Sequence, residues 1–232
     1  MTGQSPNTSE LPLAGYIEHT LLSPTATRSM IERHCAEART HELFAVCVNP
    51  VWAERAVALL RETPVRVVTV VGFPLGASTS AAKAFECARA REHGVHEIDM
   101  VLHIGALKAA DRYAVRQDIE AVVKAAEDCP VKVILETAAL MDSEKVLACA
   151  LAEEAGAAFV KTSTGFALPQ VLVPGAISSG ATLADVRLLR QSVGDRLRIK
   201  ASGGIRDASF ARELIAAGAD RIGTSAGPQL VV

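Results

Sequence analysis

Two lysines lie in short, strand-like segments that each end near a glycine. Lys161 lies in F-V-K-T-S-T-G over 159–165, and Lys200 lies in R-I-K-A-S-G-G over 198–204. Because side chains alternate between the two faces of a strand, each lysine points away from an apolar face. If both enter one pocket, the ammonium group of one lowers the pKa of the other. A neutral lysine attacks carbonyl carbons, so the pair predicts Schiff-base chemistry.

A carboxylate in a third strand-like segment adds an acid to this pair. In E-I-D-M-V-L over 97–102, every second side chain is apolar, which predicts one face packed on helices and Asp99 on the inside. A structural ion pair would explain one buried charge, but an acid and two lysines on three strands favour a catalytic site. There Lys161 attacks an aldehyde, loss of water gives an imine and then an enamine, and Asp99 passes protons through water.

Two glycine-containing turns predict a phosphate-binding site. One is Ser202-Gly203-Gly204-Ile205-Arg206, after the segment that carries Lys200, and the other is Gly223-Thr224-Ser225, at the last strand-like segment. In (β/α)₈ barrels the loops after strands 7 and 8 often bind phosphate through backbone N–H groups. Glycine permits positive φ angles and a close approach of the anion. A tight turn without a ligand is the alternative explanation for either turn alone.

Cysteine and histidine side chains near strand ends are further candidates. Cys47 alternates with apolar neighbours and is predicted to line the pocket beside Asn49, although a buried apolar thiol is the commoner outcome. His19 and His103 lie in or directly after strand-like segments, within reach of the same site. No two histidines have the spacing of metal ligands, so no metal site is expected.

The segments that must position these residues alternate between strand-like and helix-like patterns. The predicted strands are Tyr16–Thr20, Leu43–Asn49, Arg66–Phe73, Glu97–Leu102, Lys132–Thr137, Phe159–Thr164, Arg198–Gly203 and Arg221–Ser225. Helices are predicted at, among other places, Ser80–His93, Ala109–Ala126, Ser143–Ala155, Leu183–Gln191 and Ala208–Ala217. Ser29 and Thr182 are candidate helix N-caps, and the helix-ending glycines are Gly94, Gly156 and Gly218.

Eight strand–helix units in 232 residues predict an α/β protein, a (β/α)₈ TIM barrel. A doubly wound open sheet is the alternative. No change of composition divides the chain, so one domain is expected over 11–232, after a frayed segment at 1–10. The least regular segment, 167–180, is predicted to be a long functional loop after the sixth strand.

The composition narrows the classes of partner and the compartment. A net charge of −2 and an aromatic content of 4% argue against nucleic-acid binding. No run approaches the roughly 18 apolar residues of a membrane helix, and residues 1–10 lack the apolar centre of a secretory signal. Five scattered cysteines without a C-x-x-C pair are typical of reduced thiols in a cytoplasmic protein.

Seven segments together resemble deoxyribose-phosphate aldolases, a family of class I aldolases. They are I-E-H-T-L-L (17–22), V-V-G-F-P-L-G (70–76), E-I-D-M-V (97–101), I-G-A-L-K (104–108), F-V-K-T-S-T-G-F (159–166), I-K-A-S-G-G-I-R (199–206) and R-I-G-T-S-A-G (221–227). The resemblance implies a (β/α)₈ fold and reversible cleavage of 2-deoxy-D-ribose 5-phosphate to acetaldehyde and D-glyceraldehyde 3-phosphate, in deoxynucleoside catabolism. It implies small phosphosugars and aldehydes as partners, a homodimer, and no metal or organic cofactor.

The resemblance also implies roles for residues that match the family motifs. Lys161 matches the Schiff-base lysine, Lys200 the neighbour that lowers its pKa, and Asp99 the carboxylate that relays protons. The positions that match the substrate pocket and the phosphate-binding turns are Thr20, Cys47, Thr164, Gly203, Gly204, Gly223 and Ser225.

Four features depart from the family pattern. Glu18, expected to face the substrate, stands where aspartate is usual, His103 replaces an asparagine, and Ala226 stands where serine is common. The segment 167–180 is longer and more apolar than expected. None of these changes touches the lysine pair. They leave two alternatives: an aldolase that prefers unphosphorylated aldehydes, and a catalytically silent barrel that binds a phosphorylated ligand.

Overall fold

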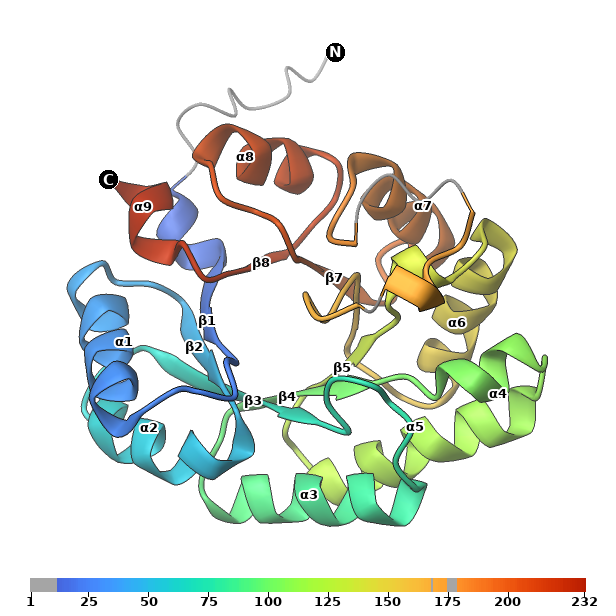
Figure 1. The fold of residues 1–232 in the computed structure, drawn as a ribbon, viewed down its shortest axis with the longest axis horizontal. Helices are drawn as coiled ribbons and strands as arrows, with labels where there is room; N and C mark the ends of the chain where they lie inside the picture. The colour runs from blue at the N-terminus through green and yellow to red at the C-terminus, as the bar shows by residue number, and fades with distance from the viewer. Residues whose placement is uncertain (1–11, 168, 175–178) are drawn as a thin grey trace.

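The chain forms a closed barrel of eight parallel strands surrounded by helices (Figure 1). The computed structural model describes residues 12–167, 169–174 and 179–232, so the expectation for residues 1–10 lies outside the described residues. The (β/α)₈ barrel predicted from the sequence is confirmed, and the doubly wound open sheet is wrong because β8 pairs with β1. No helix in the described ranges is long and apolar enough to cross a membrane.

The strands are β1 (Ile17–Leu21), β2 (Ala45–Val48), β3 (Arg66–Val71), β4 (Glu97–Val101), β5 (Val131–Ile134), β6 (Phe159–Lys161), β7 (Arg198–Ser202) and β8 (Arg221–Thr224). The α-helices are α1 (Arg28–Thr40), α2 (Ala53–Leu60), α3 (Ser80–Glu92), α4 (Ile104–Lys108), α5 (Arg112–Ala126), α6 (Asp142–Glu154), α7 (Leu183–Val193), α8 (Ala208–Ala216) and α9 (Gly227–Val231). Short 3₁₀ helices are η2 (Leu13–Tyr16), η3 (Pro50–Trp52), η4 (Thr137–Ala139) and η5 (Pro169–Val171).

The alternation of side chains along each strand divides the barrel into an apolar outside and a charged inside. Ile98, Val160 and Ile199 are fully buried between the barrel and the helices. The side chains between them along the strands point inward, and the strand register places Lys161 beside Lys200. Each fully buried aliphatic side chain of the outer layer contributes about 1.5–3 kcal/mol. The free energy from burying this apolar layer offsets the cost of burying charged side chains inside the barrel.

Local signals explain where the helices begin and end. Thr182 caps α7 as predicted, since its hydroxyl accepts the Asp185 N–H at 3.0 Å. The prediction of Ser29 as a cap is wrong: Thr27 caps α1, and Ser29 lies inside the helix. The capping residue has extended backbone, and the chain adopts that conformation at Thr27, two residues before Ser29.

The helix predicted over 109–126 is α5, which begins three residues later than predicted and ends at Ala126 as predicted. The start is later because Ala110 adopts a φ of 55°, which separates α4 from α5, and Asp111 caps the new helix. The Asp111 carboxylate accepts the Ala114 N–H at 2.9 Å. The predicted strands run one to three residues past the observed carboxyl ends at β4, β6 and β7, since the chain there turns into the loops that form the pocket.

The segment after β6 is tied to the barrel at two described points. Val173 N–H donates to the Ala138 carbonyl at 2.9 Å, beside η4. Ala181 N–H donates to the Gly203 carbonyl at 3.1 Å, on the loop after β7. The described part of the predicted loop therefore contains the turn η5 and bridges the β5 and β7 sides of the barrel (Figure 1).

A buried ion pair locks α3, α5 and β4 together. Lys83 and Asp118 are both fully buried, and the Lys83 Nζ lies 2.6 Å from Asp118 Oδ2 and 2.9 Å from the Val101 carbonyl. The Ser80 hydroxyl donates to the other carboxylate oxygen at 2.8 Å. Removing one partner of such a pair leaves an uncompensated charge in a dry interior.

We expect Lys83→Met to lower the free energy of unfolding by about 3–5 kcal/mol, because Asp118 is then buried without a cation. Adding Asp118→Leu should restore much of that loss. The matched control is Glu92→Gln in the exposed pair with Arg89, which should change the free energy by less than about 0.5 kcal/mol. Urea unfolding measures all three. A Lys83→Met variant as stable as the control would contradict the prediction.

Candidate active site

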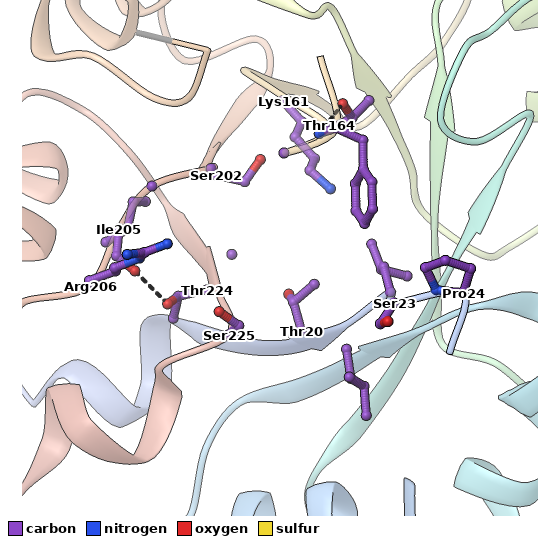
Figure 2. A pocket seen from close by; sticks show the side chains of 17 residues that line it. Thr20, Ser23, Pro24, Lys161, Thr164, Ser202, Ile205, Arg206, Thr224 and Ser225 are labelled. Atoms are coloured by element: carbon purple, nitrogen blue, oxygen red, sulfur yellow. Dashed lines mark hydrogen bonds between the residues drawn. The ribbon is translucent and has the colours of Figure 1, made fainter. Parts of the chain in front are cut away.

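A cavity of about 370 Å³ opens at the carboxyl ends of the strands. Its wall contains seven residues predicted from the sequence: Thr20, Lys161, Thr164, Gly203, Gly204, Gly223 and Ser225. Four further wall residues, Ser202, Ile205, Arg206 and Thr224, lie in the two predicted glycine turns. The wall residues that sequence reasoning did not assign to the site are Leu21, Leu22, Ser23, Pro24, Gly165 and Phe166. Figure 2 shows the Lys161 side chain pointing into the cavity, between Ser202 and Arg206 on one side and Ser23 and Pro24 on the other.

The glycine turns form the polar side of the cavity. Gly203 and Gly204 have φ angles of 90° and 75°, which L-residues rarely adopt. The Thr224 hydroxyl donates to the Ile205 carbonyl at 2.7 Å, which joins the turns after β7 and β8 (Figure 2). Gly223 lines the cavity and is also constrained by Lys200, since an added Cβ would lie 3.0 Å from Lys200 Cε. Its missing side chain makes room for the lysine.

The opposite side of the cavity is apolar. Phe166, on the loop after β6, meets Phe73 edge to face with ring centroids 5.4 Å apart. Leu21 and Pro24 extend this surface from the end of β1. The cavity therefore has a polar end and an apolar end, with the Lys161 amine between them.

Asp99 joins the two lysines beneath the cavity floor. Its Oδ2 atom accepts from Lys161 Nζ at 2.8 Å and from Lys200 Nζ at 2.7 Å. Lys161 is 2% exposed, whereas Asp99 and Lys200 are fully buried. The structure therefore brings together the three residues predicted to be catalytic, and places only Lys161 where a substrate can touch it.

Two more charged side chains belong to this cluster. Glu18 is fully buried and pairs with Lys200, so the expectation that it faces the substrate is wrong. Lys132, which sequence reasoning missed, lies 2.9 Å from Asp99 Oδ1 and 2.6 Å from Glu97 Oε2. The signal for Lys132 was its position between Val131 and Val133 in β5, the same alternation that identified Lys161.

Burial and charge shift the pKa values of the two lysines in opposite directions. Burial lowers the pKa of Lys161, Asp99 opposes this shift, and Lys200 adds to it. The neighbouring ammonium thus contributes as predicted, but burial is the larger cause. Burial alone would lower the pKa of Lys200 too, yet the carboxylates of Asp99 and Glu18 raise it. Burial opposes ionisation of Asp99, but Lys132, Lys161 and Lys200 hold its pKa well below the usual value.

Three residues that the sequence placed near the pocket lie elsewhere. Cys47 is fully buried in a small apolar cluster below the cavity, and burial raises its pKa to about 11, so it stays a neutral thiol. His103 caps α4, since its Nδ1 accepts the Ala106 N–H at 3.1 Å, a role that an asparagine side chain also fills. His19 points out of the barrel toward α1, because Glu18 and Thr20 take the inward positions of β1.

The described residues contain one group of side chains with metal-ligand chemistry, His19, His34 and Glu37. The two imidazole rings are stacked, with centroids 3.8 Å apart and planes at 26°. Nearly parallel rings cannot aim their in-plane lone pairs at one ion. The His34 Nε2 lies 3.1 Å from the His19 carbonyl, and burial lowers the pKa of His34 to about 3. The group packs α1 onto β1.

Comparison with known proteins matches residues 16–228 to the model of the DeoC/LacD family aldolases. The chain belongs to this aldolase family. A deoxyribose-phosphate aldolase of Brevibacillus brevis is 51% identical over 216 residues, which cover 93% of each chain. One from Thermoanaerobacter sp. is 50% identical over 222 residues, covering 94% of this chain and 95% of the other. The solved tetrameric deoxyribose phosphate aldolase of Aeropyrum pernix superimposes with a TM-score of 0.84 at 32% identity, covering 94% of this chain and 89% of that chain.

A buried carboxylate holds the loop after β6, which follows Lys161 in this aldolase. Glu136 follows β5, is 3% exposed, and adopts the left-handed conformation with φ 56° and ψ 63°. It accepts the Thr164 N–H at 3.3 Å and the Thr164 hydroxyl. The Phe166 N–H in turn donates to that hydroxyl at 3.0 Å. Glu136 therefore positions the loop that carries Thr164 and Phe166 into the cavity wall, and no sequence motif pointed to it.

Burial raises the pKa of Glu136, so the folded protein binds a proton there more readily than the unfolded chain. The stability from this group is full at low pH and is lost as the pH rises through its folded-state pKa. We expect Glu136→Gln to raise the melting temperature at about pH 7.5 and to lose that advantage at about pH 4. Scanning calorimetry at both values measures it. Glu62→Gln, at an exposed carboxylate, is the control and should change neither value; a Glu136→Gln variant that melts below the parent at neutral pH would count against the assignment.

Proposed function

We propose that the chain is a deoxyribose-phosphate aldolase, a class I lyase that reversibly cleaves 2-deoxy-D-ribose 5-phosphate to acetaldehyde and D-glyceraldehyde 3-phosphate. One observation carries the proposal: the Lys161 amine enters a cavity that has glycine turns at one end, while its Nζ contacts buried Asp99 at 2.8 Å. Burial lowers the pKa of Lys161, which a Schiff-base nucleophile needs. Membership of the aldolase family and relatives of that name at 50–51% identity support the same conclusion.

The reaction follows from a neutral Lys161. The amine attacks C1 of the open-chain sugar, and the carbinolamine loses water to give a protonated imine. Removal of the proton from the C3 hydroxyl breaks the C2–C3 bond, releases glyceraldehyde 3-phosphate and leaves an enamine on Lys161. The enamine gains a proton at C2, and water then releases acetaldehyde and restores the amine. The imine acts as the electron sink, so the residues must only position groups and move protons.

The charged residues below the floor suit the proton transfers. Asp99 is held as a carboxylate and Lys200 as an ammonium, so Lys200 is the donor and Asp99 the acceptor of this pair. Lys200 contacts the same oxygen, Asp99 Oδ2, that Lys161 contacts. A water at the floor of the cavity can therefore exchange protons with the pair while the carbinolamine loses its hydroxyl.

The polar end of the cavity suits the 5-phosphate. Gly203, Gly204 and Ser225 offer backbone N–H groups and a hydroxyl, and Arg206, at the end of the first glycine turn, adds a cation. Gly180 packs against this turn so closely that an added Cβ would lie 2.3 Å from the Gly203 carbonyl. The returning end of the long segment after β6 therefore supports the phosphate end. These contacts favour the phosphorylated sugar over an unphosphorylated aldehyde.

We retain three further inferences as part of this proposal. The protein works in the cytoplasm, as its free thiols suggest, and in deoxynucleoside catabolism, as the family resemblance implies. It forms a homodimer, as the family resemblance implies, although its Aeropyrum pernix relative is a tetramer. A silent binding barrel is disfavoured, because ligand binding alone gains nothing from a buried lysine with a lowered pKa.

We expect acetaldehyde followed by borohydride to attach one reduced two-carbon group to the protein, at Lys161. Intact mass and peptide mapping locate the group. Lys161→Met should abolish the adduct and reduce cleavage by at least about a thousandfold, whereas Lys108→Arg, at a surface lysine, should retain both. An adduct that maps to another lysine would overturn the assignment.

The polar end predicts a preference between substrates. We expect kcat/KM for 2-deoxyribose 5-phosphate to exceed that for 2-deoxyribose. Arg206→Ala should lower the value for the phosphorylated sugar by about 10- to 100-fold, because a charged hydrogen bond to phosphate is worth about 1.5–3 kcal/mol, and should affect the unphosphorylated sugar less. A retro-aldol assay that detects the aldehyde products measures both. Equal constants for the two sugars in the parent enzyme would favour the unphosphorylated-aldehyde alternative.

A further inference from the structure

The interior of the barrel holds three carboxylates that face the same small volume. Glu18 and Asp99 are fully buried, and Glu97 is 3% exposed. They lie on β1 and β4, on the inward face. Ionised carboxylates in a dry interior require cations nearby. The protonation state of Lys161 therefore depends on which other cations supply the positive charge that balances the three carboxylates.

Lys132 is the cation that reaches all three carboxylates. Its Nζ lies 2.6 Å from Glu97 Oε2, 2.9 Å from Asp99 Oδ1 and 3.5 Å from Glu18 Oε1. Within the described residues, Glu18 Oε1 and Glu97 Oε2 accept no hydrogen bond of good geometry, so Lys132 is the positive charge on which they depend. Burial opposes the charge of Lys132, but Asp99, Glu18 and Glu97 raise its pKa.

The charges in this cluster balance without a proton on Lys161. Lys200 pairs with Glu18 and Asp99. Arg66 on β3 lies 3.6 Å from Glu97 Oε1. Lys132, Lys200 and Arg66 thus match the three carboxylates one for one. A charged Lys161 would be a fourth cation against three anions, in a site where burial already disfavours it.

No other charged group reverses this balance. Cys47 on β2 faces the cluster as a neutral thiol, with a pKa raised by burial to about 11. Glu136, after β5, is a further carboxylate with an electrostatic effect on Lys161, and burial raises its own pKa. Arg198 and Arg221 stack on Phe159 and Phe44 nearer the other end of the barrel, and neither forms an ion pair with the three carboxylates in the described part of the chain.

We propose that Lys132 is a positioning residue of the reaction: it neutralises Asp99, Glu97 and Glu18, so that Lys161 remains an unprotonated amine. This inference rests on the proposed Schiff-base function of Lys161. Lys132 is not among the residues that line the cavity and does not touch the substrate. It acts only through the charge of the carboxylate that contacts Lys161.

The pH dependence of kcat/KM tests the proposal, since activity rises as Lys161 loses its proton. Lys132→Met leaves one negative charge in excess, which favours the Lys161 ammonium, so the acidic limb should move up by about one to three pH units. Glu97→Gln leaves one positive charge in excess and should move that limb down. The double variant restores the balance and should return the limb toward the parent position. Glu97→Gln and the double variant decide the matter if Lys132→Met alone folds poorly.

A matched control and an independent readout separate this role from a structural one. Lys83→Met also removes a fully buried lysine from a carboxylate, and it should lower stability without moving the limb. The yield of reduced acetaldehyde adduct on Lys161, measured across the same pH range, should shift with the limb in each variant. If the acidic limb of the kcat/KM profile lies at the same pH in the parent, Glu97→Gln and the double variant, the role of Lys132 is overturned. Absence of an adduct on Lys161 in the parent instead overturns the proposed function.

Discussion

The hydrogen bonds that the Asp99 carboxylate accepts from three lysines are the interaction on which the rest of the site depends. One of its oxygens accepts from Lys161 and Lys200, and the other accepts from Lys132. A carboxylate without these cations would be protonated or excluded from a dry interior. With them it remains ionised and fixes three amine groups at known positions. The proposed Schiff-base reaction needs these amines to differ in pKa. Burial together with the number of carboxylate contacts produces that difference.

The closed barrel is what allows such a cluster to exist. The cluster draws its charges from β1, β4, β5 and β7, which an open sheet would spread over its width. Closure brings β1 beside β8, and Gly223 on β8 leaves the space that Lys200 occupies on its way to Glu18. The apolar outer layer supplies the folding free energy that offsets the burial of these charges.

The two ends of the cavity above the cluster are formed by loops that follow different strands. The loops after β7 and β8 form the polar end, with two glycines in positive-φ conformations and Thr224 joining the turns. The loops after β1 and β6 form the apolar end, and Glu136 holds the latter through Thr164. Only Lys161 passes from the buried charges into this space. A single amine of the cluster is thus accessible from the cavity, while the groups that shift its pKa are buried beneath the cavity floor.

The sequence alone determined the eight-unit barrel and placed Lys161, Lys200 and Asp99 on inward faces, because apolar alternation in a strand identifies which side chains point inside. Alternation does not say how far around a closed barrel two inward side chains lie, or how far each one reaches. For that reason only the tertiary structure showed that Glu18 turns to Lys200, that Lys132 reaches Asp99, and that Cys47 lies below the cavity floor. Inward direction is a local property of the backbone, whereas contact depends on the register between strands and on side-chain length.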